Sequence, residues 1–539
     1  MPDGLDFDAV IVGAGFSGLY MLYRLRDVLG LSARVYEAGD GVGGTWYWNR
    51  YPGARCDSES FYYCYSFSRE LEQEWTWSSK YPEQPEILSY LEHVADRFDL
   101  KRDITLSTRV TGATFREGDG SWEVRTDDGA VVTARYLISA VGCLSAANVP
   151  PIPGLERFEG SWYHTGAWPH DGVDFSGQRV ALIGTGSTGI QATPVIAAEA
   201  DHLTVFQRTP NYSVPARNFL MSDEATREIK ASYPEIRRKA RESFGGFPYD
   251  RSERSALADS PEEREALYER LWAEEGGFKF IYGSYNDLLI NQAANDTAAE
   301  FIRGKIREIV KDPEVAETLA PKDYPYGTKR PPIDTHYFET FNRDNVRIVD
   351  LRRTPITEIT ATGVRTTDGD YEVDIIVFAT GFDAMTGSLL RIDPEGRAGT
   401  PLATAWEGGP VTYLGLQVAG YPNLFLITGP GSPSVLTNMP LAIEQHVEWI
   451  ADCIAFMREH GWTTVEATED AQGAWVDIVR DVAEVTLFHK ANSWYLGANI
   501  PGKKRVFMPY VGGFAPYREH CDEVVAEGYR GFSFSGSPA

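Results

Sequence analysis

The sequence predicts an α/β protein in which two similar units of strand, glycine-rich turn and helix are accompanied by a mainly helical insertion. The first unit begins near the N-terminus with the apolar run "FDAVIVG", and the second begins after residue 178 with "RVALIG". Apolar runs of this length, bounded by glycine and followed by helical spacing, predict buried parallel strands with crossover helices. From about residue 218 to 323 the chain is polar with apolar residues three and four apart, which predicts helices.

The first unit carries a complete dinucleotide-binding fingerprint. Gly13-x-Gly15-x-x-Gly18 lies between the expected strand and helix, and Glu37 closes the next strand, "ARVY". We expect Gly13 to permit the tight turn, Gly15 the approach of a pyrophosphate, and Gly18 the close packing of helix on strand. The helix N-terminus would face the phosphates, and Glu37 would accept hydrogen bonds from ribose hydroxyls. The pattern therefore predicts a Rossmann-like domain.

The second unit repeats this pattern but ends differently. The residues expected to bind a second dinucleotide lie in its turn and helix start, and they are Gly184, Gly186, Ser187, Thr188 and Gly189. The next strand ends in Arg208-Thr209 instead of an acid. Because a carboxylate would repel a 2′-phosphate and an arginine binds one, the pattern favours NADP(H). The plainer interpretation is a solvated arginine at a strand end.

Composition and charge disfavour several kinds of partner. The 539 residues include 51 Lys and Arg against 77 Asp and Glu, a net charge of −26, so the average field repels nucleic acids and anionic membrane surfaces. The apolar run at 9–23 follows three aspartates and is too short to span a bilayer, so we expect no signal peptide and no membrane segment. We predict no metal site and infer no obligate protein partner.

The cysteines argue against chemistry based on a disulfide. There are five, at positions 56, 64, 143, 453 and 521, and none belongs to a CxxC or CxxxxC pair. This usage fits a reducing, cytoplasmic location and lacks the redox-active pair of a disulfide reductase. Two dinucleotide sites without such a pair predict FAD that exchanges electrons with NADPH, with O2 as the acceptor.

A third motif lies just ahead of the second unit. The stretch "FEGSWYHTGAWPH" contains Phe158, Gly160, His164, Trp168, Pro169 and His170 in a spacing that resembles the fingerprint of Baeyer–Villiger monooxygenases. Residues 43–60, 327–331, 379–384 and 493–503 are similar to segments of the phenylacetone and cyclohexanone monooxygenase group. On the residues alone, the stretch is a proline-restricted linker whose aromatic side chains pack between domains.

The resemblance implies an enzyme that uses FAD, NADPH and O2 to convert a ketone into an ester or lactone. In such enzymes O2 adds to the flavin C4a carbon, and the peroxide anion that results attacks the carbonyl. That chemistry requires a fixed cation, for which Arg330 is the candidate, because a guanidinium stays protonated and stabilises both the peroxide and the oxyanion of the adduct. Asp57 is the carboxylate expected to pair with Arg330 and orient it.

The same resemblance implies further site residues. Those expected to lie against the flavin are Gly44, Thr45, Trp46 and Asp57. Lys329 would complete the 2′-phosphate pocket with Arg208 and Thr209, and Trp494 would hydrogen-bond the nicotinamide nucleotide from a mobile loop. His164 is expected to couple the two domains as they move, not to act as an acid or base. Without the resemblance, Lys329 is an ordinary surface lysine and Trp494 an ordinary packed aromatic.

The predicted domain organisation is discontinuous. We expect an FAD-binding domain at 1–148 and 376–539, an NADP-binding domain at 149–217 and 324–375, and a helical insertion at 218–323 that shapes substrate access. The loop at 430–439 resembles the phenylacetone-type enzymes, which favours bulky cyclic or aryl ketones.

Two other functions stay open at this stage. One is an N- or S-oxygenating flavin monooxygenase, which would share both glycine fingerprints. The other is a non-catalytic flavoprotein that senses NADPH through domain motion.

Overall fold

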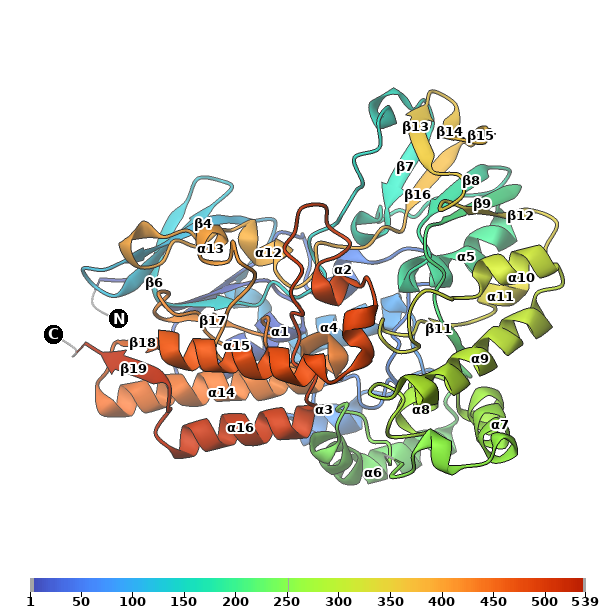
Figure 1. The fold of residues 1–539 in the computed structure, drawn as a ribbon. Coiled ribbons are helices and arrows are strands. Elements are labelled where there is room, and N and C mark those ends of the chain that lie inside the picture. The colour runs from blue at the N-terminus through green and yellow to red at the C-terminus, as the bar shows by residue number, and fades with distance from the viewer. Residues whose placement is uncertain (1–3, 251, 537–539) are drawn as a thin grey trace.

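The computed structural model describes residues 4–250 and 252–536. Its two largest sheets stand apart from each other, at the left and the upper right of Figure 1. The first sheet has seven strands in the order β3-β2-β1-β6-β5-β4, and β17 also pairs with β6. Its strands are β1 (Phe7–Val12), β2 (Ala33–Tyr36), β3 (Ile104–Thr105), β4 (Val110–Arg116), β5 (Ser121–Thr126), β6 (Val131–Ser139) and β17 (Leu424–Leu426).

The centre of the first sheet is parallel and buried. In β1, Ile11 lies opposite Val35 of β2 on one side and Ile138 of β6 on the other. Such apolar, two-sided strands need cover on both faces. Because parallel strands end at the same edge, the turn after β1 and Glu37 after β2 lie at one edge of the sheet. Helix α1 (Phe16–Tyr23) begins at this same edge of the sheet.

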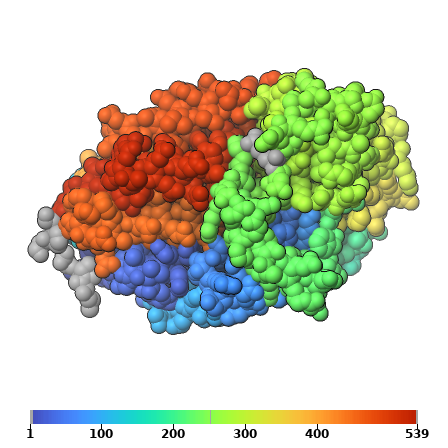
Figure 2. Space-filling model, turned by 90° about the horizontal axis from the view of Figure 1, so that it is seen from below, coloured from blue at the N-terminus to red at the C-terminus, as the bar shows by residue number. Residues whose placement is uncertain are grey.

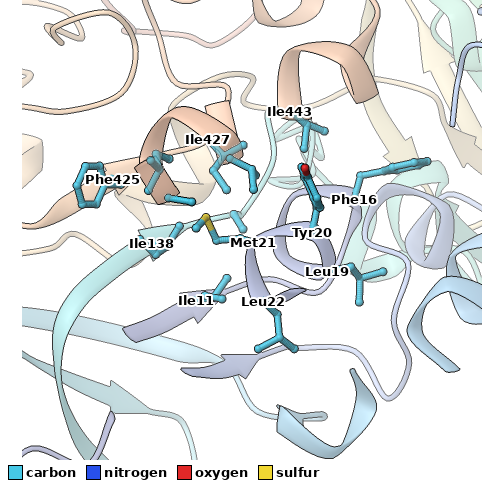
Figure 3. Packing of buried hydrophobic residues seen from close by; sticks show 14 of the residues in the cluster. Ile11, Phe16, Leu19, Tyr20, Met21, Leu22, Ile138, Phe425, Ile427 and Ile443 are labelled. Atoms are coloured by element: carbon cyan, nitrogen blue, oxygen red, sulfur yellow. The ribbon is translucent and has the colours of Figure 1, made fainter. Parts of the chain in front are cut away.

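Helix α1 lies within the hydrophobic core of the first domain. Figure 3 shows Met21 pointing toward Ile138 of β6 and Tyr20 toward Ile443 of α14 (Met439–His460). Met21 and Leu22 are fully buried, and each such side chain stabilises the fold by about 1.5–3 kcal/mol relative to an exposed one. The chain thus places the fingerprint helix between the sheet and the long C-terminal helix.

The second sheet is entirely parallel, in the order β12-β9-β8-β16-β7. Its strands are β7 (Ser161–His164), β8 (Arg179–Ile183), β9 (His202–Gln207), β12 (Val346–Asp350) and β16 (Ile375–Phe378), and helix α5 (Ser187–Glu199) follows β8. A small antiparallel sheet of β13 (Ile356–Thr360), β14 (Gly363–Thr366) and β15 (Asp370–Glu372) lies beside it. The α/β class with two Rossmann-like sheets is thereby confirmed.

One strand lies in the second sheet, although the sequence was interpreted as placing it in the first domain. We placed residues 376–384 in the first domain, yet β16 pairs with β8 and β7 of the second sheet. An all-apolar strand fits the buried centre of either parallel sheet, so its composition carries no information about which sheet it joins. The chain crosses back toward the first domain only after Phe378, where Asn148 N–H donates to Gly381 O at 3.0 Å. Two crossing segments therefore run side by side between the sheets.

The described residues of the segment 218–323 are mainly helical. Its helices are α6 (Asp223–Glu242), α7 (Pro261–Arg270), α8 (Lys279–Tyr282), α9 (Gln292–Ile309) and α10 (Pro313–Leu319), flanked by the paired short strands β10 (Val214–Pro215) and β11 (Ile333–Asp334), with α11 (Tyr337–Thr340) after them. Ser222 caps α6, and Ser260 with Glu263 forms a capping box on α7. Figure 2 shows this insertion, in green, packed beside the C-terminal helices in red.

The C-terminal part completes the first domain. It contains α12 (Gly387–Leu390), α13 (Leu402–Ala405), α14, β18 (Thr464–Ala467), α15 (Glu469–Glu484), α16 (Phe514–Ala526) and β19 (Phe532–Ser535), while α2 (Thr45–Trp48), α3 (Arg69–Glu74) and α4 (Gln84–Arg97) come from the N-terminal part. Gly461, at φ 71°, ends α14 in the left-handed conformation. Across the described residues, no helix combines the length and the apolar character required to cross a membrane.

Candidate active site

A cleft of about 1330 Å³ lies between the two sheets, and both glycine-rich turns line it. The predicted cofactor and catalytic residues meet there, except for two glycines that lie beneath the turns. Those lining the cleft are Gly13, Gly15, Glu37, Gly44, Thr45, Trp46, Asp57, Gly184, Gly186, Ser187, Thr188, Arg208, Thr209, Lys329, Arg330 and Trp494. Residues more than 400 positions apart thus face one cavity.

Both glycine-rich turns have the same geometry. Gly13 and Gly184 have φ values of 104° and 112°, which side-chain-bearing residues rarely adopt. A Cβ on Gly18 would lie 1.8 Å from the carbonyl oxygen of Gly13, and a Cβ on Gly189 2.1 Å from that of Gly184. Only glycine allows each helix to approach its strand so closely, which is why Gly18 and Gly189 do not reach the cleft.

The helices that follow the two turns have backbone N–H groups at their N-termini that are available to bind an anion. Gly15 precedes α1 and Gly186 precedes α5, and neither N-terminus has a side-chain cap. The first backbone N–H groups of a helix have no partner within the helix, and they carry its positive dipole end. Ser187 and Thr188 form the first turn of α5 and line the cleft. Each unit therefore offers a phosphate site at a helix start.

The segment after Gly43 covers the first turn. Gly44, at φ 54°, precedes α2, and a Cβ on Gly44 would lie 2.9 Å from the Cα of Gly15. Within α2, Thr45 is exposed and Trp46 is buried, and the Trp46 indole N–H donates to the Tyr63 hydroxyl at 3.2 Å. The two glycine segments thus touch each other and close one side of the first nucleotide site.

Arg330 lines the cleft and is held by contacts on several sides. Its Nε donates to Asp57 Oδ2 at 2.6 Å and its Nη2 to Asp57 Oδ1 at 2.9 Å, a bidentate pair. Its Nη1 donates to the carbonyl oxygen of Val435 at 2.9 Å. The guanidinium carbon lies 4.4 Å from the centre of the Phe278 ring. Three residues from three distant segments therefore fix one planar cation.

The charge on Arg330 is secure. Burial by itself would lower the pKa of Arg330, but the adjacent Asp57 carboxylate outweighs burial and holds the pKa above its usual value. The Arg330 side chain is 19% exposed, so the ion pair is screened from bulk water yet reachable from the cleft. A fixed cation of this kind can stabilise an oxyanion without reorganising.

Arg208 and Lys329 form a second cationic group in the cleft. Arg208 is exposed and has no hydrogen bond or ion pair among the described residues. Burial and the nearby Arg208 charge lower the pKa of Lys329 to about 8, against a weaker opposing effect of Asp323. Thr209 follows in the same turn, and its carbonyl oxygen accepts from Thr185 Oγ1 at 3.0 Å. Two neighbouring cations without a carboxylate bound to them suit a doubly charged phosphate.

Trp494 lies on a segment that folds over the cleft. It begins a short 3-10 turn, Trp494–Leu496, and lines the cavity. Farther along, Asn499 Nδ2 donates to Phe382 O at 2.7 Å, and Lys503 Nζ donates to Asp383 Oδ1 at 2.5 Å. The loop is therefore fastened to the second crossing segment between the two sheets.

The six defined residues of the third motif lie outside the cavity lining, at the junction of the domains, while Gly166 and Ala167 between them line it. A Cβ on Gly160 would lie 2.3 Å from Asp374 O, so only glycine allows β7 to approach the start of β16. Phe158 packs against the core of the second domain, and Trp168 is buried with its ring 6.3 Å from that of Phe175. Pro169 leads to His170, whose ring lies 5.0 Å from that of Tyr47 in α2. The motif thus joins the second domain to the first.

His164 sits at the crossing segments. Gly166 N–H donates to His164 Nδ1 at 3.0 Å, which leaves the proton of a neutral ring on Nε2. Within the described residues, buried Nε2 has no hydrogen-bond partner. Burial lowers the pKa of His164, and the backbone of Gly381 and of Asn148 opposes this effect. The ring is thus neutral and next to both crossing segments, which fits a coupling role better than acid–base chemistry.

Two groups that hold Arg330 were not predicted from the sequence. Phe278 comes from the insertion, directly after Gly276 and Gly277, whose φ values of 61° and 57° break the helical pattern. Two adjacent glycines inside a helical stretch were the available signal. The Val435 contribution is a backbone carbonyl, which no residue type can reveal.

Known proteins resemble this chain over nearly its whole length. Residues 10–228 match the family model described as pyridine nucleotide-disulphide oxidoreductase. The chain is 48% identical to a Baeyer–Villiger monooxygenase of Pseudooceanicola batsensis over 98% of this chain and 96% of that one. It is 44% identical to cyclohexanone 1,2-monooxygenase of Acinetobacter sp (99% and 97%) and 43% identical to a phenazine N-monooxygenase of Lysobacter antibioticus (100% and 98%).

Solved structures agree with these relatives. A structure described as oxidized steroid monooxygenase bound to NADP superposes with a TM-score of 0.93 at 55% identity, covering 98% of this chain and 99% of that one. A structure described as the OTEMO complex with FAD and NADP gives a TM-score of 0.95 at 42% identity, covering 98% of this chain and 100% of that one.

The two Rossmann-like sheets and the shared cleft define an oxidoreductase with two dinucleotide sites. In the described structure all five cysteines are unpaired and buried. The near-complete match to its relatives settles the family: the chain belongs to the Baeyer–Villiger monooxygenases.

Proposed function

We propose that this monooxygenase converts a ketone into an ester or lactone in the cleft beside Arg330. NADPH, O2 and a proton are consumed with the ketone, and NADP+ and water leave with the product, so that atoms and electrons balance. Bound FAD supplies the chemistry of accepting hydride from NADPH and activating O2. The observation that carries the proposal is the guanidinium of Arg330, fixed by Asp57 and open to the cleft.

The residues present fit both cofactors. Around the first turn, glycines leave room that a Cβ would fill, and α1 presents uncapped N–H groups. We assign Gly13, Gly15, Gly18, Glu37, Gly44, Thr45, Trp46 and Asp57 to FAD. Around the second turn, unpaired cations suit the 2′-phosphate of NADPH. We assign Gly184, Gly186, Ser187, Thr188, Gly189, Arg208, Thr209, Lys329 and Trp494 to that cofactor.

Arg330 has a defined task in this scheme. Addition of an oxygen nucleophile to a ketone turns the carbonyl oxygen into an alkoxide, and negative charge is stabilised by donors already in place. Asp57 engages Nε and Nη2, so the guanidinium cannot rotate away, while Phe278 supports its face. Removing such a stabilising group costs about 2.7–4 kcal/mol, or roughly a hundredfold to a thousandfold in rate.

The decisive experiment replaces this cation. Arg330→Ala should fold and retain FAD, yet form at least about a hundredfold less ester per NADPH oxidised. Arg330→Lys should restore only part of the yield, because an ammonium lacks the planar fork that Asp57 orients. Arg347→Ala is the matched control, since Arg347 lies against Tyr371 outside the cleft lining. A near-normal ester yield from Arg330→Ala would refute the assignment.

We propose a bulky cyclic or aryl ketone as substrate. The loop at 430–439 supplies Val435 and Met439 to the cleft wall, and the similar solved structure named for a steroid substrate supports a roomy site. A panel of steroid, aryl, cyclohexanone-sized and acyclic ketones, analysed by mass spectrometry, tests this. Selective turnover of the small acyclic ketones would contradict it.

N-oxygenation is a second candidate, because the phenazine N-monooxygenase relative is 43% identical. A nitrogen nucleophile generates no alkoxide at a carbonyl, so N-oxide formation should depend less on Arg330 than ester formation does. Incubation with a phenazine and a ketone together, followed by product analysis, distinguishes the two reactions.

We propose the same domain boundaries that the sequence predicted, with one change. The NADP-binding domain takes residues 149–217 and 324–378, which keeps β16 with its partners, and the FAD-binding domain takes 1–148 and 379–539. The insertion at 218–323 supplies Phe278 to the catalytic centre. We also propose a cytoplasmic location, which the unpaired cysteines support.

A further inference from the structure

One tyrosine connects the two cations of the second site. The Nζ atom of Lys329 lies 4.4 Å from the centre of the Tyr324 ring. The Tyr324 hydroxyl lies 2.9 Å from Pro210 O and 2.8 Å from Asn211 Oδ1, and shares its proton between them. Pro210 and Asn211 directly follow Arg208-Thr209. A single buried side chain therefore touches the lysine and the turn that carries the arginine.

That turn is tied in its own right to the glycine-rich loop. Asn211 Nδ2 donates to Thr185 O at 2.7 Å, and Thr185 Oγ1 donates to Thr209 O at 3.0 Å. Thr185 lies between Gly184 and Gly186. The hydrogen bonds thus run from the glycine-rich loop through Asn211 to Tyr324, and the ring contact continues to Lys329.

Lys329 needs such support because its surroundings oppose its charge. It is partly buried and faces Arg208, a like charge, while the carboxylate that favours it, Asp323, is bound by Arg352 at 2.6 Å. Arg352 is further paired with Asp350. An aromatic face is attractive to an ammonium and adds no charge that would repel a phosphate.

We propose that Tyr324 is a positioning residue for NADPH selectivity. Its ring holds the Lys329 ammonium and its hydroxyl holds the turn of Arg208, so that both cations converge on the phosphate that NADPH has and NADH lacks. The inference rests on the proposed NADPH site and adds a residue that does not itself touch the phosphate. A tyrosine that merely filled the core would affect both nucleotides equally.

The test measures binding of two small ligands to the FAD-loaded enzyme by calorimetry. 2′,5′-ADP carries the discriminating phosphate, and 5′-AMP lacks it. Tyr324→Phe keeps the ring and removes the tether, so 2′,5′-ADP should bind several-fold more weakly. Tyr324→Leu removes both, and the loss should reach about tenfold, the range expected when a desolvated cation–π contact is lost. The affinity for 5′-AMP should change less than twofold.

The pH dependence separates positioning from packing. In Tyr324→Leu the ring no longer favours the ammonium, so the pH at which 2′,5′-ADP affinity falls should move downward. Tyr371→Leu is the matched control, because Tyr371 also lies against a cation, Arg347, at 4.9 Å. It should leave the ratio of the two affinities unchanged.

The outcomes are distinct. Equal losses for both ligands, or a loss no larger than that of Tyr371→Leu, overturn the role of Tyr324. If Lys329→Ala also leaves 2′,5′-ADP affinity unchanged, the phosphate site itself is misplaced and the proposed NADPH site fails with it. Should Tyr324→Leu not fold, Tyr324→Phe still tests the tether.

Discussion

The two nucleotide units share a backbone and differ in how far the protein closes around them. At the first turn, a Cβ on Gly15 would lie 3.3 Å from the Cα of Gly44, because the segment at 43–46 lies directly against it. At the second turn, a Cβ on Gly186 would meet no atom within 4 Å. The middle glycine is enclosed by protein in one unit and open in the other.

The residue that follows the second strand of each unit shows the same difference between an enclosed and an open site. Glu37 is buried, and its carboxylate accepts the N–H groups of Ala14 and Gly39, each at 2.8 Å. It is part of the protein's own hydrogen-bond network. Arg208 is exposed and has no partner within the described residues. The acidic strand end is hydrogen-bonded within the protein, whereas the basic strand end is free to bind an anion.

This difference matches the roles of two cofactors. A flavin that stays bound through many turnovers suits a site closed by the fold. A nicotinamide nucleotide that is exchanged in every cycle suits an open site whose affinity comes from charges. We infer that the same glycine pattern supports both uses, and that neighbouring segments decide between them.

The largest expected effect follows from the enclosed glycine. Gly15→Val should yield protein without bound FAD, because the added methyl groups must displace Gly44 and fill the pyrophosphate space. Gly186→Val should retain FAD and raise the KM for NADPH, since its side chain enters only the second site. The flavin absorbance per protein measures the first effect and steady-state kinetics the second. Stoichiometric FAD in Gly15→Val would invalidate our placing of the flavin.

The Arg208 and Lys329 pair should give the next largest effect. Arg208→Ala and Lys329→Ala should each lower kcat/KM for NADPH by roughly ten- to a hundredfold, the value of a hydrogen bond to a charged group. The value for NADH should change little, because NADH has no 2′-phosphate. Equal losses with both cofactors would show that these cations serve the fold and not the phosphate.

Local patterns predicted the parts of this comparison that depend on residue type. Glycine spacing fixed both turns, and the change from Glu37 to Arg208 indicated two different nucleotides. Periodicity did not reveal that β16 joins the second sheet, because an all-apolar strand suits either one. It also could not reveal that Gly44 closes the first site, since that contact joins separate segments.

The proposed catalytic centre shows the same limit. The resemblance to known enzymes gave Arg330 and Asp57, and their side chains form a bidentate pair. The Val435 carbonyl and the Phe278 ring come from segments more than 50 residues away, and their contacts arise only on folding. Tyr324 was equally hidden, because a tyrosine has many ordinary places in a core.

A smaller effect should follow from the closed strand end. Glu37→Gln keeps one acceptor oxygen and replaces the other with an NH2 group, which accepts no hydrogen bond. One of the two buried backbone N–H groups is then left unpaired, at a cost of about 1–3 kcal/mol. The thermal unfolding midpoint of the FAD-loaded enzyme should fall. Arg208→Ala should leave that midpoint nearly unchanged, because exposed, unpaired side chains contribute within about 0.5 kcal/mol. Equal midpoints for the two variants would erase the contrast between the strand ends.

The smallest expected effect is a pH dependence confined to the open site. Lys329, with a pKa lowered to about 8, is charged below that pH and becomes neutral above it. NADPH affinity should therefore be complete near pH 7 and fall as the pH rises through 8, by up to about tenfold at pH 9 if only the charged lysine binds the phosphate. NADH affinity should not follow, because no phosphate meets this lysine. Lys329→Arg should abolish the pH dependence, since a guanidinium does not titrate in this range.

The measurement is the Kd of NADP+ against that of NAD+ between pH 7 and pH 9. His164 cannot produce a slope in this window, because burial lowers its pKa further below 7. A fall in NADP+ affinity that persists in Lys329→Arg would assign the titration to another group, and the open site would then owe its selectivity to Arg208 alone.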